Sequence, residues 1–357
     1  MTGSEHRALL IGYGFAGAWI HDPLIRATPG IRVAGIVTRD RDRRALAHTR
    51  DANVAMFRSA ASAIESGEFN VVVVATPNDS HAELACAAMA AGMAVVVDKP
   101  LTTDVGSATE LVEHASALGA TLTVFHNRRW DGDYLTIRRL IDDGALGTVH
   151  TFVSRFDRWV PDPSPNWRDV DAVAGGGVLL DLGAHLIDQA ILSLGPVTSV
   201  HSVLDRDNPD RVSEDRFALQ LTHASGVRSH LHASEQEGDP SMRFHVSGSN
   251  GSFVKRGKDI QEERLLAGEL PVPGESGAEP PPRWGSLHRG DAGQLIETAV
   301  GDWTAFYRQL VAHLEGNGPV PVRPEEHIAV LEVIEAAQRS NREQRTITLA
   351  PDRAGAR

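Results

Sequence analysis

Apolar and polar positions alternate in two different rhythms along the chain, and the change falls near residue 125. Before it, short runs of aliphatic and β-branched residues are separated by segments in which apolar residues recur every three or four positions. The runs lie at 8–11, 32–37, 71–75, 94–97 and 121–125. Strand and helix signals in this order predict a doubly wound parallel sheet.

After residue 126 the apolar runs alternate with polar positions over longer stretches. They lie at 150–155, 197–204, 217–222, 227–233 and 242–247, and helical patterns lie at 134–143, 303–313 and 325–341. Successive strands of this kind predict a large open sheet, mixed or antiparallel. Stretches rich in Pro and Gly at 161–165 and 271–282 are expected to be loops. We therefore expect an α/β chain with a Rossmann domain at 1–125 and an α+β domain at 126–357.

A glycine-rich turn follows the first apolar run. Its residues are Gly12, Tyr13, Gly14, Phe15, Ala16 and Gly17, a GxGxxG pattern between a strand and a helix. Glycines at this place let the backbone approach a pyrophosphate, which the helix N-terminus then holds. The turn predicts a dinucleotide site.

The residues after the second run decide which nicotinamide cofactor the site prefers. An acidic side chain there binds the ribose 2′-hydroxyl of NAD, whereas an arginine accepts the 2′-phosphate of NADP. Thr38 offers a hydroxyl, and Arg39 forms a cationic patch with Arg43 and Arg44 in an acidic protein, which favours NADP. Asp40 keeps NAD open as the alternative, with the arginines forming only the solvated start of a helix.

A lysine follows the fourth run in the sequence Asp98-Lys99-Pro100. The chain contains three lysines among its 35 basic residues, so a lysine at the carboxyl edge of the sheet is a candidate for chemistry that arginine cannot perform. The proline fixes the local backbone, and a cis bond would aim the side chain into a cleft. The alternative is a surface lysine at a strand end.

Three glycines at 175–177 lead into a helical pattern that carries Asp181 and His185. Residues four apart share one helical face, where a histidine can accept a hydroxyl proton and a carboxylate can orient it. A metal site of two histidines and a carboxylate would need a second histidine at a suitable offset, which the pattern lacks. A plain solvated helix face is the other alternative.

Composition limits the possible partners. The chain has 357 residues, 41% hydrophobic and 23% charged, as in an ordinary globular protein of about two domains. Its net charge of −12 argues against nucleic acid and anionic membranes as partners. No apolar run approaches the length of a membrane span and no signal pattern precedes the first strand, so we expect a cytoplasmic protein. One cysteine, Cys86, excludes an internal disulfide.

Taken together, these motifs resemble the family of glucose-fructose oxidoreductases and inositol dehydrogenases (Gfo/Idh/MocA). The resemblance spans nearly the whole chain and is carried by the glycine turn, by the Lys-Pro pair and by the helix with Asp181 and His185. It also includes Ala75, Thr76, Pro77 and Asn78, followed by His81. Segments at 21–24, 126–131, 134–137 and 252–255 are similar to the NADP-dependent scyllo-inositol dehydrogenase branch. The family's usual glutamate before the lysine is Asp98 here.

The resemblance implies an enzyme that transfers a hydride between NADP and a hydroxyl carbon of a cyclic polyol or sugar. It implies that His185 is the general base, that Asp181 orients it, and that Lys99 binds the reacting oxygen. Cofactor contacts are expected from the glycine turn, Thr38, Arg39, Arg43, Thr76, Pro77, Asn78, His81, Asp98 and Lys99. Substrate contacts are expected from Lys99, Asn127, Arg128, Trp167, Arg168, Asp181 and His185. No metal is required.

The family habit also implies a dimer or tetramer formed through the sheet of the second domain, which binds the substrate. Two alternatives stay open. A same-fold enzyme acting on another aldose, diol or ketone would keep Lys99, Asp181 and His185. A non-catalytic dinucleotide-binding regulator would tolerate their loss, so their joint presence argues against it.

Overall fold

The computed structural model describes residues 5–162 and 176–349, and these residues form two compact units. Unit 1 takes its residues from Met1–Asn127, Ile260–Ser276 and Asp302–Ile328. Unit 2 takes its residues from Arg128–Asp259, Gly277–Gly301 and Ala329–Arg357. A single division at residue 125 separates the first segments, but two later segments return to unit 1.

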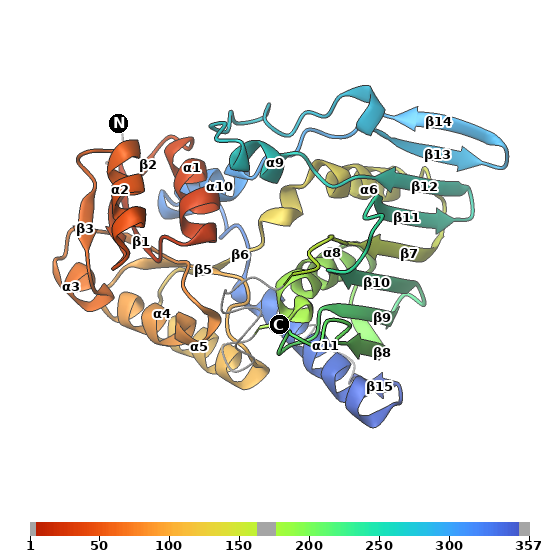
Figure 1. Ribbon diagram of the computed structural model, residues 1–357, viewed down its shortest axis with the longest axis horizontal. Helices are drawn as coiled ribbons and strands as arrows, with labels where there is room; N and C mark the ends of the chain where they lie inside the picture. The colour runs from red at the N-terminus through yellow and green to blue at the C-terminus, as the bar shows by residue number, and fades with distance from the viewer. Residues whose placement is uncertain (1–4, 163–175, 350–357) are drawn as a thin grey trace. The chain divides into compact units, whose positions relative to one another are not determined.

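Unit 1 contains a six-stranded, wholly parallel sheet of order β3-β2-β1-β4-β5-β6 (Figure 1). The strands are β1 (His6–Ile11), β2 (Ile31–Val37), β3 (Ala55–Phe57), β4 (Val71–Val74), β5 (Ala94–Asp98) and β6 (Leu122–Phe125). This is the doubly wound order, whose direction reverses between β1 and β4, so loops after those strands flank a crevice at the carboxyl edge. The prediction of a Rossmann fold is confirmed.

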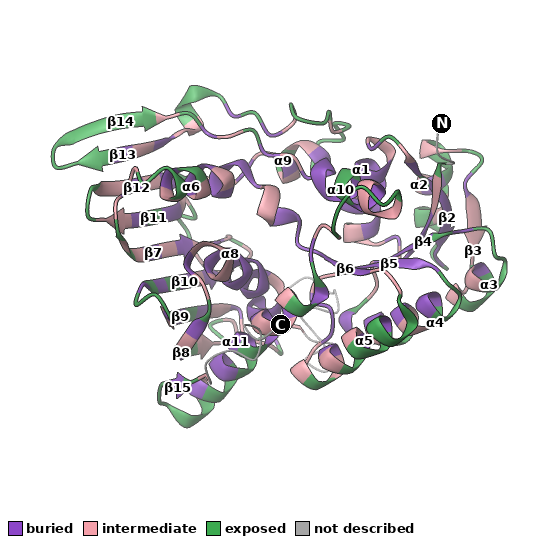
Figure 2. Cartoon of the chain, turned by 180° about the vertical axis from the view of Figure 1, so that it is seen from behind, coloured by how far each residue is buried: buried purple, intermediate pink, exposed green. Residues whose placement is uncertain are grey.

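Helices cover both faces of this sheet. On one face lie η1 (Ala16–His21), α1 (Asp22–Arg26), α2 (Arg41–Arg50) and α10 (Thr304–Leu314), and on the other α3 (Ala60–Glu65), α4 (His81–Ala90) and α5 (Val105–Leu118) (Figure 1). All residues of β4 are buried because helices pack on both sides, which explains its unbroken run of valines. In Figure 2, α5 turns a buried stripe inward and an exposed one outward.

The returning segments complete the core of unit 1. The Phe125 ring at the end of β6 lies 4.9 Å from that of Phe306 and 5.9 Å from that of Tyr307, both on α10. Thr123 of the same strand donates its hydroxyl proton to the carbonyl of Val322 at 2.7 Å. The short helix α9 (Gln261–Leu266) also belongs to this unit. Residues nearly 200 positions apart therefore share one core.

Unit 2 is built on a nine-stranded mixed sheet of order β14-β13-β12-β11-β7-β10-β9-β8-β15. Its strands are β7 (Val149–Arg155), β8 (Val197–Asp205), β9 (Arg216–His223), β10 (Arg228–Ser234), β11 (Met242–Gly248), β12 (Gly251–Arg256), β13 (Gly285–Arg289), β14 (Ala292–Ile296) and β15 (Ile347–Thr348). β7 and β10 pair in parallel and the other neighbours are antiparallel. The predicted large open sheet is confirmed.

Helices of unit 2 pack on one face of that sheet. They are α6 (Gly132–Asp142), α8 (Ala184–Leu194) and most of α11 (Pro324–Glu343), and the π-helical segment η4 (Leu179–Gly183) leads directly into α8. Ser202 of β8 donates its hydroxyl proton to the carbonyl of Ala337 on α11. At the far edge, β13 and β14 form a long hairpin whose outer strand is largely exposed (Figure 2). Among the described residues, no helix combines the length and apolarity needed to cross a membrane.

Candidate functional site

The glycine turn of unit 1 lies between β1 and η1, at the point where the strand order reverses. Gly12 has a φ of +93°, and a Cβ there would lie 2.4 Å from the carbonyl oxygen of Ala75. A Cβ on Gly17 would lie 2.1 Å from the carbonyl oxygen of Gly12. A side chain at either position would therefore collide with backbone. The turn forms a tight cradle that fits the pyrophosphate of a dinucleotide.

The side chains within the turn point to different environments. The Tyr13 hydroxyl is buried and donates to Asp22 Oδ2 at 2.7 Å, and burial raises the pKa of Tyr13. Asp22 also accepts from Arg50 at 2.9 Å and from Arg26 at 2.6 Å. The buried Tyr13 side chain therefore anchors the turn to the interior of unit 1. The Phe15 side chain, in contrast, is 49% exposed. The expected cofactor contact of Tyr13 can come from its backbone.

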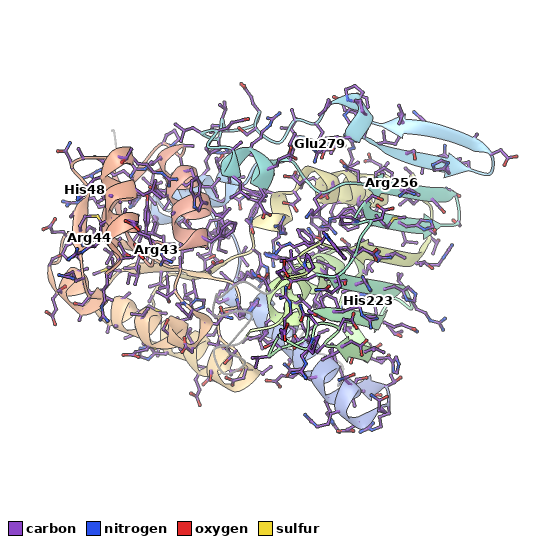
Figure 3. All side chains as sticks on the ribbon, in the orientation of Figure 1. Arg43, Arg44, His48, His223, Arg256 and Glu279 are labelled. Carbon is purple, nitrogen blue, oxygen red and sulfur yellow. The ribbon has the colours of Figure 1, made fainter. Side chains whose placement is uncertain are left out.

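The segment after β2 carries an acid and several cationic groups, with Nε of Arg43 3.9 Å from Asp40 Oδ2. Asp40 caps α2 by accepting hydrogen bonds from the backbone N–H groups of Asp42 and Arg43 at 2.9 and 3.0 Å. These hydrogen bonds, of which the one from Arg43 has the largest effect, lower the pKa of Asp40. The guanidinium of Arg43 lies against Gly14, 3.7 Å from where a Cβ would be. Figure 3 shows Arg43 and Arg44 side by side on α2. The Asp40 carboxylate thus caps α2, and the Arg43 guanidinium faces the glycine turn.

Thr38 and Arg39 complete this edge. Thr38 is buried and its hydroxyl accepts the N–H of Asp40 at 3.3 Å. Arg39 is exposed and donates from Nε to the carbonyl of Arg58 at 3.2 Å, which leaves the far end of its guanidinium at the surface. The structure therefore brings Arg43 to the glycine turn and places Thr38 and Arg39 just beyond β2.

The loop after β4 carries Thr76, Pro77 and Asn78, and it is tied to the loop after β5 by His81. The His81 ring lies between two carbonyl oxygens, with Nε2 3.0 Å from that of Thr76 and Nδ1 2.8 Å from that of Pro100. His81 is buried. His81 therefore holds the two loops together. The sequence analysis expected His81 to contact the cofactor, and the structure gives its ring this structural role.

Lys99 follows β5 at the carboxyl edge of the same sheet, as predicted. Its peptide bond to Pro100 is cis. Its backbone N–H donates to the Asp98 carboxylate, Oδ1, at 2.9 Å. Asp98 Oδ2 in turn lies 3.9 Å from Nε2 of His21, a histidine that is fully buried. The Asp98 carboxylate therefore lies between the backbone of Lys99 and a buried imidazole.

The burial of His21 predicts a pH dependence of stability. Desolvation lowers the pKa of His21 to about 4, against the opposing charge of Asp98, from about 6.5 in the unfolded chain. Between these values the unfolded state binds a proton that the folded state does not. The free energy of unfolding therefore falls by about 3 kcal/mol from this group alone as the pH drops from 7 to 4.

Urea titrations of the parent protein and of His21→Phe at both pH values check this prediction. The variant should lose less stability than the parent over the interval, by about that amount. His223, whose pKa is also lowered by burial, is present in both proteins, so the difference isolates His21. An identical pH dependence in the two proteins would contradict the assignment.

Asp181 and His185 lie in unit 2, four residues apart across the junction of η4 and α8. His185 is buried, with 6% exposure, and the Asp181 side chain is 23% exposed. The segment starts at Gly177, whose φ is +101° and where a Cβ would meet Glu214 at 2.3 Å. Glu214 accepts the N–H of Leu179 at 3.2 Å, so it caps the first turn.

A group of cations gathers around Phe156, next to Asp181. The Phe156 ring centroid lies 4.5 Å from the guanidinium carbon of Arg128, 5.3 Å from that of Arg158 and 4.8 Å from Nζ of Lys258. Nη1 of Arg158 lies 3.9 Å from Asp181 Oδ2. Arg128, expected at the site, is therefore in this group; the sequence analysis did not identify Arg158. The sequence signal that could have identified Arg158 is its position three residues after the end of β7.

The remaining expected residues take other positions. Asn127 is buried in unit 1, two residues beyond β6, where the 3-10 helix η3 (Asn127–Trp130) begins. Trp167 and Arg168 lie outside the described residues. Asp188, a turn beyond His185, is held by two bonds from Arg129 at 2.6 and 2.9 Å. In the described part of the chain, no three His, Cys, Asp or Glu side chains gather as they would around a metal ion.

A dinucleotide cradle on a doubly wound sheet, with a lysine at the sheet's carboxyl edge, defines a Rossmann-type oxidoreductase. Comparison with known families agrees: the oxidoreductase family with an NAD-binding Rossmann fold matches residues 6–126, and the GFO/IDH/MocA C-terminal domain matches residues 134–254. The chain belongs to the Gfo/Idh/MocA family of oxidoreductases.

Individual relatives cover the chain almost completely. It is 38% identical to the uncharacterized oxidoreductase YdgJ of Escherichia coli, over 96% of this chain and 99% of the relative. It is 32% identical to the scyllo-inositol 2-dehydrogenase (NADP(+)) IolW of Bacillus subtilis, over 95% of each. Among solved structures, the YPO2259 oxidoreductase from Yersinia pestis superposes with a TM-score of 0.90 at 35% identity, over 98% of this chain and 99% of that one.

Proposed function

We propose that the protein is an NADP-preferring dehydrogenase that oxidises a secondary hydroxyl of a cyclic polyol, in the manner of a scyllo-inositol dehydrogenase. The observation that carries the proposal is the position of Lys99, at the carboxyl edge of the sheet whose glycine turn cradles a dinucleotide. The similarity to IolW, named as an NADP(+)-dependent scyllo-inositol 2-dehydrogenase, supports the substrate class. The expected oligomer formed through the sheet of unit 2 stays a prediction.

The residues of the turn fit the cofactor. Gly12 and Gly17 would receive the pyrophosphate, because neither position has room for a side chain. Arg43 and Arg39 would receive a 2′-phosphate, since both are exposed cations and Asp40 is engaged in capping α2. When bound, the nicotinamide ring supplies the hydride acceptor for the carbinol carbon.

The chain's own residues would manage the proton and the developing charge. His185 is proposed to accept the hydroxyl proton, and Asp181 to orient the imidazole and bind a neighbouring hydroxyl. Lys99 is proposed to donate a hydrogen bond to the reacting oxygen, which becomes negative as its proton moves to His185. Because proton and hydride leave the same CH–OH group, the product is a ketone, and the reverse reduction uses the same groups.

Cofactor preference is tested through Arg43. Arg43→Ala should raise the Kd for NADPH about tenfold to a hundredfold, because it removes a charge-assisted bond to the 2′-phosphate, and should change the Kd for NADH little. Fluorescence titration with both nucleotides measures this. Arg41→Ala, at the start of the same helix, is the matched control and should leave both constants unchanged.

The same titrations, followed by a panel of inositols, aldoses and their keto forms, test the function as a whole. Tight NADPH binding with turnover on an inositol is the expected result. Tighter binding of NADH would refute the role of the arginines. Turnover restricted to an aldose or diol would replace the substrate class, and binding without any turnover would favour a regulator of the same fold.

A further inference from the structure

The buried imidazole of His21 connects three groups of unit 1, one of which precedes Lys99. Its Nδ1 lies 2.6 Å from the hydroxyl of Tyr307, and its Nε2 lies 3.9 Å from Asp98 Oδ2. Its ring centroid lies 4.2 Å from that of Phe125. His21, Phe125 and Tyr307 are almost fully buried, so these contacts operate away from bulk solvent.

The Tyr307 hydroxyl and the Asp98 carboxylate together favour one tautomer of His21, because either tautomer permits the contact at Nδ1 but only one turns an N–H toward the carboxylate. Burial, reinforced by the charge of Asp98, raises the pKa of Tyr307 well above its ordinary value, so the hydroxyl keeps its proton and can donate to Nδ1. A neutral imidazole that accepts at Nδ1 carries its proton on Nε2. The N–H of His21 then points toward the Asp98 carboxylate and attracts it. The opposite tautomer would direct a lone pair at that carboxylate.

The Asp98 carboxylate links the imidazole of His21 to the backbone of Lys99. One carboxylate oxygen accepts the N–H of Lys99 at 2.9 Å, and the other faces Nε2 of His21. The Asp98 side chain is 14% exposed, so the interaction of its charge with the imidazole N–H dipole is only partly screened by water. The first contact is a hydrogen bond, and the second, at 3.9 Å, is an electrostatic attraction that favours the same rotation of the carboxylate, and with it the place of the N–H that it holds.

We propose that His21 is a positioning residue for Lys99, acting through Asp98 and held in the required tautomer by Tyr307 and Asp98 together. The inference rests on the proposed function, in which Lys99 binds the reacting oxygen. Packing alone does not account for an imidazole at this position, because a phenyl ring fills similar space without the cost of burying two polar nitrogens. The three side chains come from η1, β5 and α10, and all belong to unit 1.

The test measures kcat, KM and the NADPH Kd with the polyol and NADP+ for His21→Phe in two backgrounds. In the parent, His21→Phe should lower kcat about tenfold or more and leave the NADPH Kd within about twofold. In Lys99→Ala, the same substitution should lower kcat less than about twofold, because the group that it positions is gone. His21→Gln, which keeps an N–H near Nε2, should recover most of the kcat.

Several outcomes would overturn the inference. An equal loss of kcat in both backgrounds would mean that His21 acts independently of Lys99. An equal loss in Phe306→Leu, a matched change in the same buried cluster, would mean that only core packing matters. An unchanged kcat in Lys99→Ala alone would instead refute the proposed role of Lys99, so the two failures are distinguishable.

A spectroscopic readout keeps the inference testable without turnover. The chain has three lysines, of which Lys255 is buried, so reductive methylation with 13C-formaldehyde gives few signals besides that of the N-terminal amine, and Lys99→Arg identifies that of Lys99. Tyr307→Phe, which removes one hydroxyl and no ring, should move the Lys99 signal, whereas Phe306→Leu should not. A Lys99 signal unmoved by Tyr307→Phe would overturn the inference, even if His21→Phe fails to fold.

Discussion

Lys99→Ala is expected to lower kcat for polyol oxidation about a hundredfold to a thousandfold and to leave the Kd for NADPH within a few-fold. The physical reason is that, in the proposed mechanism, the ammonium stabilises negative charge that develops on the reacting oxygen in the transition state, whereas the glycine turn and the arginines are proposed to hold the cofactor. Steady-state kinetics with the inositol panel, together with fluorescence titration of NADPH, measure the two quantities separately.

Lys99→Arg is the matched control for charge. A planar guanidinium is wider than an ammonium and presents its donors in a fixed fork, so it should recover little of the lost kcat although the charge is kept. Full activity in Lys99→Arg would mean that only the positive charge matters at this position. Full activity in Lys99→Ala would refute the assignment of Lys99 to the reacting oxygen.

Arg243→Met is expected to lower the free energy of unfolding by about 3–5 kcal/mol. Arg243 is 1% exposed and lies in the core of unit 2, where Nε donates to Asp133 at 3.1 Å and the other nitrogens to Ser154 at 2.8 Å and Gln189 at 3.1 Å. Methionine fills much of the volume but leaves the fully buried Asp133 carboxylate without its cation. Nearby Asp131, whose pKa is already raised well above its usual range by burial, would lose a compensating charge.

Urea unfolding of three variants separates the effect of the lost charge on the free energy of unfolding from the effect of the changed side-chain volume. The double variant Arg243→Met with Asp133→Asn should recover part of the loss, because it removes the uncompensated charge. Arg256→Met, on the neighbouring strand β12 and exposed, should cost less than about 0.5 kcal/mol. A loss in Arg243→Met no larger than in Arg256→Met would contradict the view that Arg243 neutralises this core.

The elements that the sequence predicted are those whose burial is imposed by their neighbours. β4 and β5 read as unbroken apolar runs because helices cover both faces of the parallel sheet. β3 was missed because it has three residues of intermediate burial at the edge of that sheet. β14 was missed because it is almost wholly exposed, so no apolar run marks it.

The residues of the site also divide into those that the sequence predicted and those that it did not. The glycine turn and Lys99 were predictable because a glycine pattern and a strand end are local signals. The buried pair of His21 and Tyr307 next to Asp98 was not, since these two residues are 286 positions apart and meet only in the folded unit. Likewise Arg243 and Asp133 are 110 positions apart, and no spacing along the chain relates them. Long-range pairing of polar groups in a core leaves little trace in a single sequence.

The return of 302–328 to unit 1 has a consequence for synthesis on the ribosome. The dinucleotide-binding unit begins at the N-terminus, yet the carbonyl that accepts the Thr123 hydroxyl and the rings that cover Phe125 are translated about 180–200 residues after those positions. A nascent chain that has emerged only as far as β6 therefore presents an apolar, unsatisfied patch where α10 will dock. The core of this unit can therefore be completed only after residues 302–328 have been translated.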